Sequence, residues 1–258
     1  MAQSIDAVWL TVSSALRGFD RPLLKNLSRH YTLAQWDYCQ SQDESLSLEI
    51  ALTLLHDYLQ SHDRPVHLAG HGTAGLLALL YARHYPERVR SLSLLSVGVN
   101  PAVDWQAYYY LQLQQFHHSR DELLTQMVYL LFGYQPAPIV RELRQILDRD
   151  LQSSLSPHTL CQQFNVFPGG VSVPLLVCGS HTDRVISHHA LEAWQPWLTD
   201  RDRLWLCPNG RYFFHYFQPR SVSYQIAQFW LAQDVHEIRQ YWISQTVLFP
   251  HSSHQIKA

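Results

Sequence analysis

The segment whose residue types and spacing point most clearly to chemistry is a tight turn of small residues at positions 70–75. The sequence VHLAGHGTAG runs from a strand-like apolar stretch into this turn and then directly into a helical pattern. Small residues are required where a strand and a helix approach closely around a strained turn. A side chain at the apex of such a turn projects clear of the backbone, which is where an acyl-transfer nucleophile sits. The apex residue here is Gly72, which carries no nucleophilic atom.

Two other segments carry polar residues directly after apolar strand patterns. The segment VPLLVCGSHTDRVIS carries Asp183 just after an apolar strand pattern, and RLWLCPNGRYFFHYFQP carries Tyr212 and His215 after another. Ligands of open parallel sheets bind at the carboxyl ends of the strands, so these residues are expected near the turn. A hydroxyl, a histidine and an acid gathered there would form a catalytic triad.

Over these segments the chain resembles the α/β-hydrolases. The family pattern at the turn is Gly-x-Ser-x-Gly, for which this chain has GHGTA, and the following LLALLYARHYPERVRSLSLLSVG is also similar to that family. The resemblance covers most of residues 7–100 and 172–232. It implies a nucleophile position at Gly72, a general-base position at Tyr212 and an acid position at Asp183.

The residues at these triad positions do not support the usual chemistry. Gly72 cannot attack a carbonyl, and a tyrosine at position 212, with an ordinary pKa of about 10, is a poor base near neutral pH. Asp183 could accept a hydrogen bond from the Tyr212 hydroxyl, or it could cap the turn that follows it. His215 is predicted to be a packing or helix-start histidine, although a displacement by one turn would let it replace the missing base.

The loop that would bind the oxyanion also departs from the family. The resemblance implies a His-Gly pair after the first long strand, and Trp9–Gly18 contains none, although it contains Ser13 and Ser14. Backbone N–H groups could still form such a hole. Members of a triad act as a unit, and three separate segments are changed. We therefore interpret the chain as a natural pseudo-hydrolase that binds a small ligand or a protein partner.

An unconventional hydrolase acting on an ester, thioester or amide is the alternative. Its nucleophile would be Thr73, Ser13 or Ser14, although Thr73 also fits a first-turn threonine bonded to the backbone. Water positioned by Asp183 and His215 is another route. The residues expected around the binding site are Ser13, Ser14, His71, Thr73 and His215.

A metal site has little support in the sequence. Histidine and carboxylate side chains suit zinc or iron, but the candidates show no i,i+4 pair, and a chain with 16 histidines brings some together by chance. We predict no metal and no cofactor. The residues considered as ligands are His71, His181, Asp183 and His215.

Short apolar strands alternate with helical periodicity along the chain, and these elements must position the site. The alternation predicts an α/β fold with a mostly parallel sheet and helices on both faces. Residues 102–168 are helical without strands, so we predict a helical cap there, inserted into a core of residues 1–101 and 169–258. The expected strands are Ala7–Ser13, Tyr31–Tyr38, Val66–Ala69, Val89–Ser96, Pro174–Cys178 and Arg203–Cys207, and the expected helices of the core are Leu23–Arg29, Leu46–Gln60, Thr73–His84, His188–Leu198 and Ser221–Ala232, with a loose tail after Gln240.

Composition limits the classes of partner. The 258 residues are 47% hydrophobic and 16% charged, with 19 basic and 21 acidic side chains, a net charge of −2. This balance gives no electrostatic basis for binding nucleic acid, and no run reaches the roughly 20 apolar residues of a membrane span. We expect a cytoplasmic protein. Aromatic residues of the cap could line a pocket for a hydrophobic small molecule, form a protein contact or pack against the core: Trp105, Tyr108, Tyr109, Tyr110, Phe116, Tyr129, Phe132 and Tyr134, with Tyr212, Phe213 and Phe214 of the core.

Overall fold

The computed structural model describes residues 4–39, 47–115, 119–156 and 167–248, and the side chains as far as residue 239. Phe116 of the predicted aromatic set lies outside these residues. No helix among them is both long enough and apolar enough to cross a membrane.

A six-stranded sheet forms the centre of the molecule, with the strand order β2-β1-β3-β4-β5-β6. Every neighbouring pair is parallel. The predicted parallel α/β sheet is therefore confirmed, with strand ends that shift by a few residues from those expected. The strands are β1 (Ala7–Thr11), β2 (Leu33–Asp37), β3 (Val66–His71), β4 (Val89–Leu95), β5 (Leu175–Ser180) and β6 (Arg203–Cys207).

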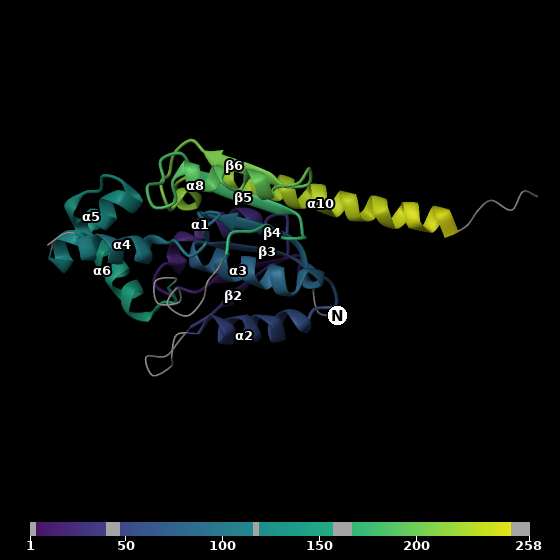
Figure 1. Ribbon diagram of the computed structural model, residues 1–258, viewed down its shortest axis with the longest axis horizontal. Coiled ribbons are helices and arrows are strands. Elements are labelled where there is room, and N and C mark those ends of the chain that lie inside the picture. Colours follow the sequence, from purple (N-terminus) through teal and green to yellow (C-terminus); the bar gives the residue numbers. More distant parts are fainter. Residues whose placement is uncertain (1–3, 40–46, 116–118, 157–166, 249–258) are drawn as a thin grey trace, which may run out of the picture.

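The side chains of each strand point alternately to two faces, and each face packs on its own helices. In β1, Val8 and Leu10 join a cluster with α2 (Leu48–Gln60) and α3 (Thr73–His84). Ala7 and Trp9 join a second cluster with α1 (Arg21–Leu27) and α10 (Pro219–Leu248). Because both faces are covered, the inner strands are buried along almost their whole length. The α10 helix extends past the sheet (Figure 1) and runs to Leu248, so the predicted end of this helix at Ala232 is wrong. The predicted loose tail after Gln240 is helical as far as Leu248, and residues 249–258 lie outside the described residues.

Three helices lie beyond one end of the sheet, where the chain leaves β4 and before it returns at β5 (Figure 1). Of these, α6 (Ala137–Ser153) is amphipathic, and the buried apolar residues of all three belong to the same cluster as α2 and α3. The division into a cap at 102–168 and a core stays a prediction. These helices are α4 (Trp105–Gln115), α5 (Arg120–Phe132) and α6 (Ala137–Ser153), and the shorter elements of the core are η1 (Arg17–Phe19), η2 (Pro86–Arg88), α8 (His188–Glu192), η3 (Gln195–Trp197) and α9 (Phe214–Phe217).

Candidate functional site

The turn between β3 and α3 has the geometry of a sharp elbow. Gly72 has φ +55° and ψ −124°, a backbone conformation that glycine adopts far more readily than other residues. The turn is also closely packed, because a Cβ on Gly70 would lie 2.7 Å from the backbone of Ala74. One on Gly75 would lie 2.6 Å from the Val97 side chain. The small residues in the motif are therefore required by close approach.

Tyr212 occupies the space in front of this elbow. Its hydroxyl lies closer than 3.0 Å to the point where a Cβ on Gly72 would project. The ring is 2% exposed, and burial raises the pKa of the phenol well above its usual value. A neutral tyrosine hydroxyl thus fills the volume that a side chain at the apex would need.

Asp183 is held by donors other than the tyrosine hydroxyl. Its Oδ1 accepts hydrogen bonds from the backbone N–H groups of Val185 (2.8 Å) and Ile186 (3.1 Å), and its Oδ2 accepts from Ser96 Oγ (3.1 Å). The predicted turn-capping role is therefore what the contacts show, whereas the alternative bond from the Tyr212 hydroxyl is not found among the described contacts. Burial raises the pKa of Asp183 to about 7.

His215 is fully buried and is not next to Asp183. Its Nε2 lies 3.1 Å from Oδ1 of Asp20, and Oδ2 of the same carboxylate accepts a hydrogen bond from Trp9 Nε1 at 3.0 Å. Burial lowers the pKa of His215 to about 3 and raises that of Asp20 to about 6. The Nδ1 atom of His215 has no partner among the described residues. This histidine joins the loop after β1 to α9, which agrees with the predicted packing role.

His71 precedes the apex and lies against both His215 and Tyr212. Its Nε2 is 2.9 Å from the carbonyl oxygen of Tyr212, so this nitrogen must carry the proton and donate it. The ring centroids of His71 and His215 are 4.4 Å apart. Burial, reinforced by His215, lowers the pKa of His71 to about 3, and the imidazole is neutral at pH 7. Its Nδ1 is therefore left as an acceptor.

Thr73 is engaged with a carboxylate. Its hydroxyl donates to Oδ2 of Asp104 at 2.6 Å, in a buried setting. Asp104 caps α4, since its Oδ1 accepts from the backbone N–H of Ala107 at 2.8 Å. Burial raises the pKa of Asp104 to about 6. The prediction that the Thr73 hydroxyl bonds to the backbone is therefore wrong, because the hydroxyl donates to the side chain of Asp104.

Asp150 gathers polar groups from three parts of the chain. Its carboxylate accepts hydrogen bonds from Ser13 Oγ in the loop after β1, and it is 1% exposed. Ser14, the neighbouring candidate, is exposed. Burial raises the pKa of Asp150 even though four side chains donate to it. The remaining three donors are Trp105 Nε1 (2.9 Å), Gln106 Nε2 (2.8 Å) and Ser154 Oγ (2.6 Å).

Most of these groups, although not Asp183, Ser96 or His215, line a cavity of about 50 Å³. Pockets that hold drug-sized ligands measure roughly 300–1,000 Å³, so the space above the elbow has room for only a water or two. Of the predicted aromatic set, Trp105, Tyr212 and Phe213 line the cavity, whereas Tyr129 and Tyr134 are exposed. No thiol lines it. The residues brought together at its walls include Ser13, Asp20, His71, Thr73, Asp104, Asp150 and Tyr212.

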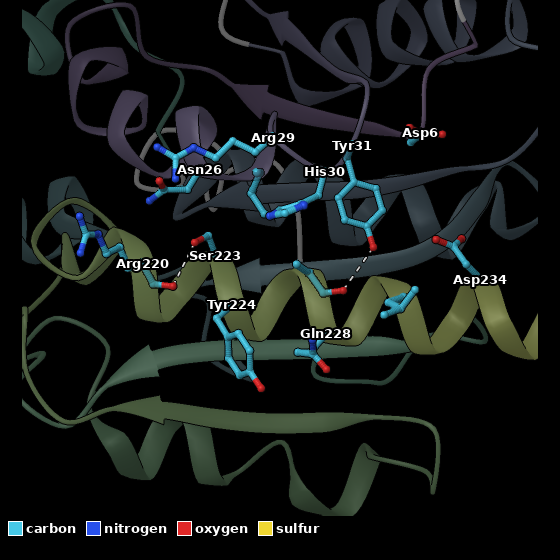
Figure 2. Close-up of a pocket in the computed structure, with 13 residues that line it drawn as sticks. Asp6, Asn26, Arg29, His30, Tyr31, Arg220, Ser223, Tyr224, Gln228 and Asp234 are labelled. Atoms are coloured by element: carbon cyan, nitrogen blue, oxygen red, sulfur yellow. Dashed lines mark hydrogen bonds between the residues drawn. The ribbon is translucent and has the colours of Figure 1, made fainter.

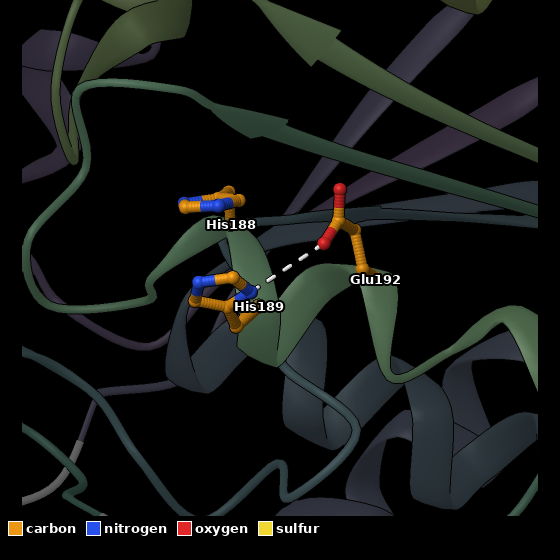
Figure 3. A group of neighbouring side chains, drawn as sticks. All are labelled: His188, His189 and Glu192. Atoms are coloured by element: carbon orange, nitrogen blue, oxygen red, sulfur yellow. Dashed lines mark ion pairs between the residues drawn. The ribbon is translucent and has the colours of Figure 1, made fainter.

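A possible metal-ligating group among the described residues lies elsewhere, on α8. His188, His189 and Glu192 place one ligand atom each within 4.8 Å of one another (Figure 3). His189 Nδ1 is 3.6 Å from a Glu192 carboxylate oxygen, and both side chains are well exposed. The four residues considered from the sequence do not form such a group within the described chain.

Asp20, Ser96, Asp104 and Asp150 take part in the site although the sequence reasoning missed them. One signal for Asp150 was available: Val140, Leu143, Leu147 and Asp150 share one buried helix face, and a carboxylate there needs buried partners. A second signal was the position of Asp104 directly before a helix, where an aspartate caps the first turn. Asp20 gave no local signal, because its partner His215 lies 195 residues away.

Solved structures with the same fold include lipolytic and esterolytic proteins. A bacterial membrane phospholipase A is 20% identical, with a TM-score of 0.71 over 91% of this chain and 81% of that chain. The carboxylesterase CesB of Bacillus subtilis is 16% identical, with a TM-score of 0.67 over 89% and 84%. The naproxen esterase of the same organism is 17% identical, with a TM-score of 0.63 over 89% and 84%. At these identities the likeness shows the fold alone, and it confirms the α/β-hydrolase fold.

Two curated proteins match at much higher identity. The uncharacterized protein sll0249 of Synechocystis sp. is 49% identical over 86% of this chain and 89% of its own length. The uncharacterized protein alr2406 of Nostoc sp. is 43% identical over 89% and 92%. No family profile matches the sequence. The chain therefore belongs to the same family as these two uncharacterized proteins and has the α/β-hydrolase fold.

Proposed function

We propose that this protein is a non-hydrolytic member of the α/β-hydrolase fold that acts by binding and not by acyl transfer. The observation that carries this proposal is the position of Tyr212, whose hydroxyl lies where a side chain on Gly72 would project. An acyl-enzyme needs a nucleophilic atom at that apex and an imidazole beside it. Here the apex has no side chain, and the neighbouring space holds a neutral phenol.

The remaining triad position also supports a non-hydrolytic role. An acid that orients a catalytic histidine stays ionised and hydrogen-bonded to that ring. Asp183 is instead bonded to Ser96 and to backbone amides, and its pKa is raised to about 7 by burial. The neutral histidine at position 215 is paired with Asp20. The acid and the imidazole therefore serve two different parts of the structure.

The small volume above the elbow favours binding at the surface over binding in the usual substrate pocket. A cavity of about 50 Å³ does not accommodate an ester with an acyl chain. A partner, whether a protein or a small molecule, would contact another face of the molecule. A cytoplasmic location is part of the same proposal.

An unconventional hydrolase is the second candidate, and one contact favours it. The Thr73 hydroxyl, next to the apex, lies 2.6 Å from the carboxylate of Asp104, whose pKa is raised to about 6. An ionised Asp104 could accept the threonine proton. No contact of the described residues joins an imidazole to this pair, so no base is held against it to return a proton to the leaving group, and we rank it second.

Labelling with a fluorophosphonate probe separates the two functions. The purified full chain is incubated with the probe and with short-chain p-nitrophenyl esters, alongside Thr73→Val and Thr73→Ser. We expect no labelling of any of the three proteins, and no ester hydrolysis faster than the background rate that free imidazole gives. Labelling of the wild type and of Thr73→Ser, abolished in Thr73→Val, would instead establish the hydrolase.

A further inference from the structure

A groove of about 710 Å³ lies between the end of α1 and the exposed side of α10, and it shares no lining residue with the cavity at the elbow. Its volume falls within the range of pockets that hold small organic ligands. Because the two sites are separate, ligand binding in this groove does not depend on whether the elbow hydrolyses esters.

The floor of the groove is fixed by contacts of Tyr31. The Tyr31 hydroxyl donates to the carbonyl oxygen of Ala227 on α10 at 3.2 Å (Figure 2). Its ring packs edge-on against Trp230, with centroids 5.1 Å apart. The segment after α1 is therefore tied to α10, and the groove is present before any ligand binds. A preformed site loses less entropy on binding than one that must order itself.

One end of the groove carries two arginines without acidic partners. Figure 2 shows Arg29 and Arg220 at the same end, and neither forms an ion pair among the described residues. Both side chains are exposed. Two guanidinium groups offer planar pairs of N–H donors that suit a carboxylate, and Asn26 adds a further polar group beside them.

The acids at the opposite end are already neutralised. Asp6 pairs with Arg64, and Asp234 pairs with Arg90 at 2.9 Å and lies 3.1 Å from His67. The unpaired charge of the groove is therefore positive and lies at the end with Arg29 and Arg220. This favours a ligand with a single anionic end.

The wall between the two ends carries exposed apolar side chains together with the polar Ser223 and Gln228. Tyr224 is 61% exposed and Leu231 is 50% exposed, and both lie on the α10 side of the groove. Arg220 and Leu231 are eleven residues apart, about 16 Å along a helix, which is enough for a medium-length acyl chain. Covering such side chains with an apolar chain removes hydrocarbon from water.

We propose that this groove binds an amphipathic carboxylate, with its head group between Arg29 and Arg220 and its acyl chain along Tyr224 and Leu231. The two ends of the ligand are recognised separately. The head group gives specificity through charge-assisted hydrogen bonds, and the chain gives affinity through burial. The elbow is not involved, so the groove is tested on its own.

Isothermal titration of the full chain with dodecanoate tests the site. We expect saturable binding of one molecule per chain, weakened at least about tenfold in the double variant Arg29→Gln/Arg220→Gln, which loses both charge-assisted contacts. Arg21→Gln, an exposed arginine of α1 outside the groove, should bind as the wild type does. Dodecanol should bind at least about tenfold more weakly than dodecanoate, and acetate should not bind measurably.

Three results would overturn the proposal. Dodecanol could bind as tightly as dodecanoate, or the double arginine variant could keep its affinity, and in either case no carboxylate is recognised. The third result would come from Leu231→Glu, which places a charge beside the acyl chain. We expect this variant to abolish dodecanoate binding and to leave the molar mass from light scattering unchanged. A wild-type dimer that this variant converts to monomer would assign the groove to a protein–protein interface instead. Unchanged melting temperatures would show that the variants remain folded.

Discussion

The hydroxyl of Tyr212 and the missing side chain of Gly72 compete for one volume. A Cβ on residue 72 would approach the Tyr212 hydroxyl closer than 3.0 Å, a separation that real Cβ atoms essentially never show. The two residues lie 140 positions apart in the sequence, one at the end of β3 and one in the loop after β6. A glycine at the apex therefore fits both the backbone conformation and the neighbouring tyrosine, and the two positions are energetically linked.

Replacing Gly72 by serine should destabilise the protein. The positive φ alone costs a non-glycine residue about 1–3 kcal/mol, and displacement of Tyr212 adds to it. The penalty for Gly72→Ser should be smaller by about 1 kcal/mol in a Tyr212→Phe background, because the hydroxyl is absent there. Urea denaturation of the four proteins measures this coupling.

Gly18→Ser is the matched control for that cycle, since nothing lies within 4 Å of a Cβ at position 18 and its φ is not positive. Its unfolding free energy should stay within about 0.5 kcal/mol of wild type. A Gly72→Ser protein as stable as the wild type would contradict the tight elbow.

The pH dependence of stability should report the burial of Asp183. Its pKa is raised from 3.8 in the unfolded chain to about 7 in the folded one. Between these values the folded protein keeps a proton that the unfolded chain has lost, so this group makes stability fall as pH rises from about 4 to 7. Asp183→Asn does not titrate, and its stability relative to wild type should therefore rise over that window, by an amount on the order of 4 kcal/mol at most.

Urea titrations at several pH values between 4 and 8 measure this difference. Asp200→Asn, an exposed position, controls for the loss of a negative charge. A constant difference between Asp183→Asn and wild type across the whole range would mean that Asp183 is ionised throughout, as it would be beside a catalytic imidazole.

More of the fold than of the candidate site could be predicted from the sequence. Strand and helix patterns depend on neighbours in the chain, and α3 was predicted at Thr73–His84, where the structure has it. The apex at Gly72 was found because its motif is local. The orientation of Tyr212 was not, since it follows from a loop in which Gly210 and Arg211 both have positive φ. Of the three alternatives for the aromatic residues of 102–168, packing against the core describes Tyr109 and Phe132, which belong to the core cluster, whereas Trp105 belongs to that cluster and also lines the cavity.

Loss of the Asp150 charge should loosen the attachment of α4 and α6 to the core. This buried carboxylate accepts from Ser13, Trp105, Gln106 and Ser154, and an amide at the same place would offer donors where acceptors are needed. We expect Asp150→Asn to lower the unfolding free energy by about 2–4 kcal/mol. Hydrogen exchange should become faster in α4 and α6 before it does in the sheet.

Asp148→Asn, two residues earlier on the same helix, is the control. Asp148 pairs with Arg120 on the surface, with the arginine side chain about half exposed. Such a pair contributes less than about 1 kcal/mol. Equal effects of the two substitutions would show that the polar network around Asp150 does not tie the helices to the core.

Restoring a nucleophile and a base should restore some ester hydrolysis if the elbow framework is intact. In Gly72→Ser/Tyr212→His the tyrosine hydroxyl no longer blocks the apex, and the new imidazole would lie on the loop whose carbonyl at 212 already contacts Ser96, a partner of Asp183. We expect turnover of p-nitrophenyl acetate about a hundredfold above that of Gly72→Ser/Tyr212→Phe, which has the serine and the space but no base.

Both double variants carry the same strained backbone, so any loss of folding caused by Gly72→Ser affects both equally, and circular dichroism verifies that both are folded. If both fold and hydrolyse the ester at the same rate, position 212 does not stand in a triad relationship to Gly72 and Asp183. The loop after β1, where Ser13 is bound to Asp150, would then be the next segment to test.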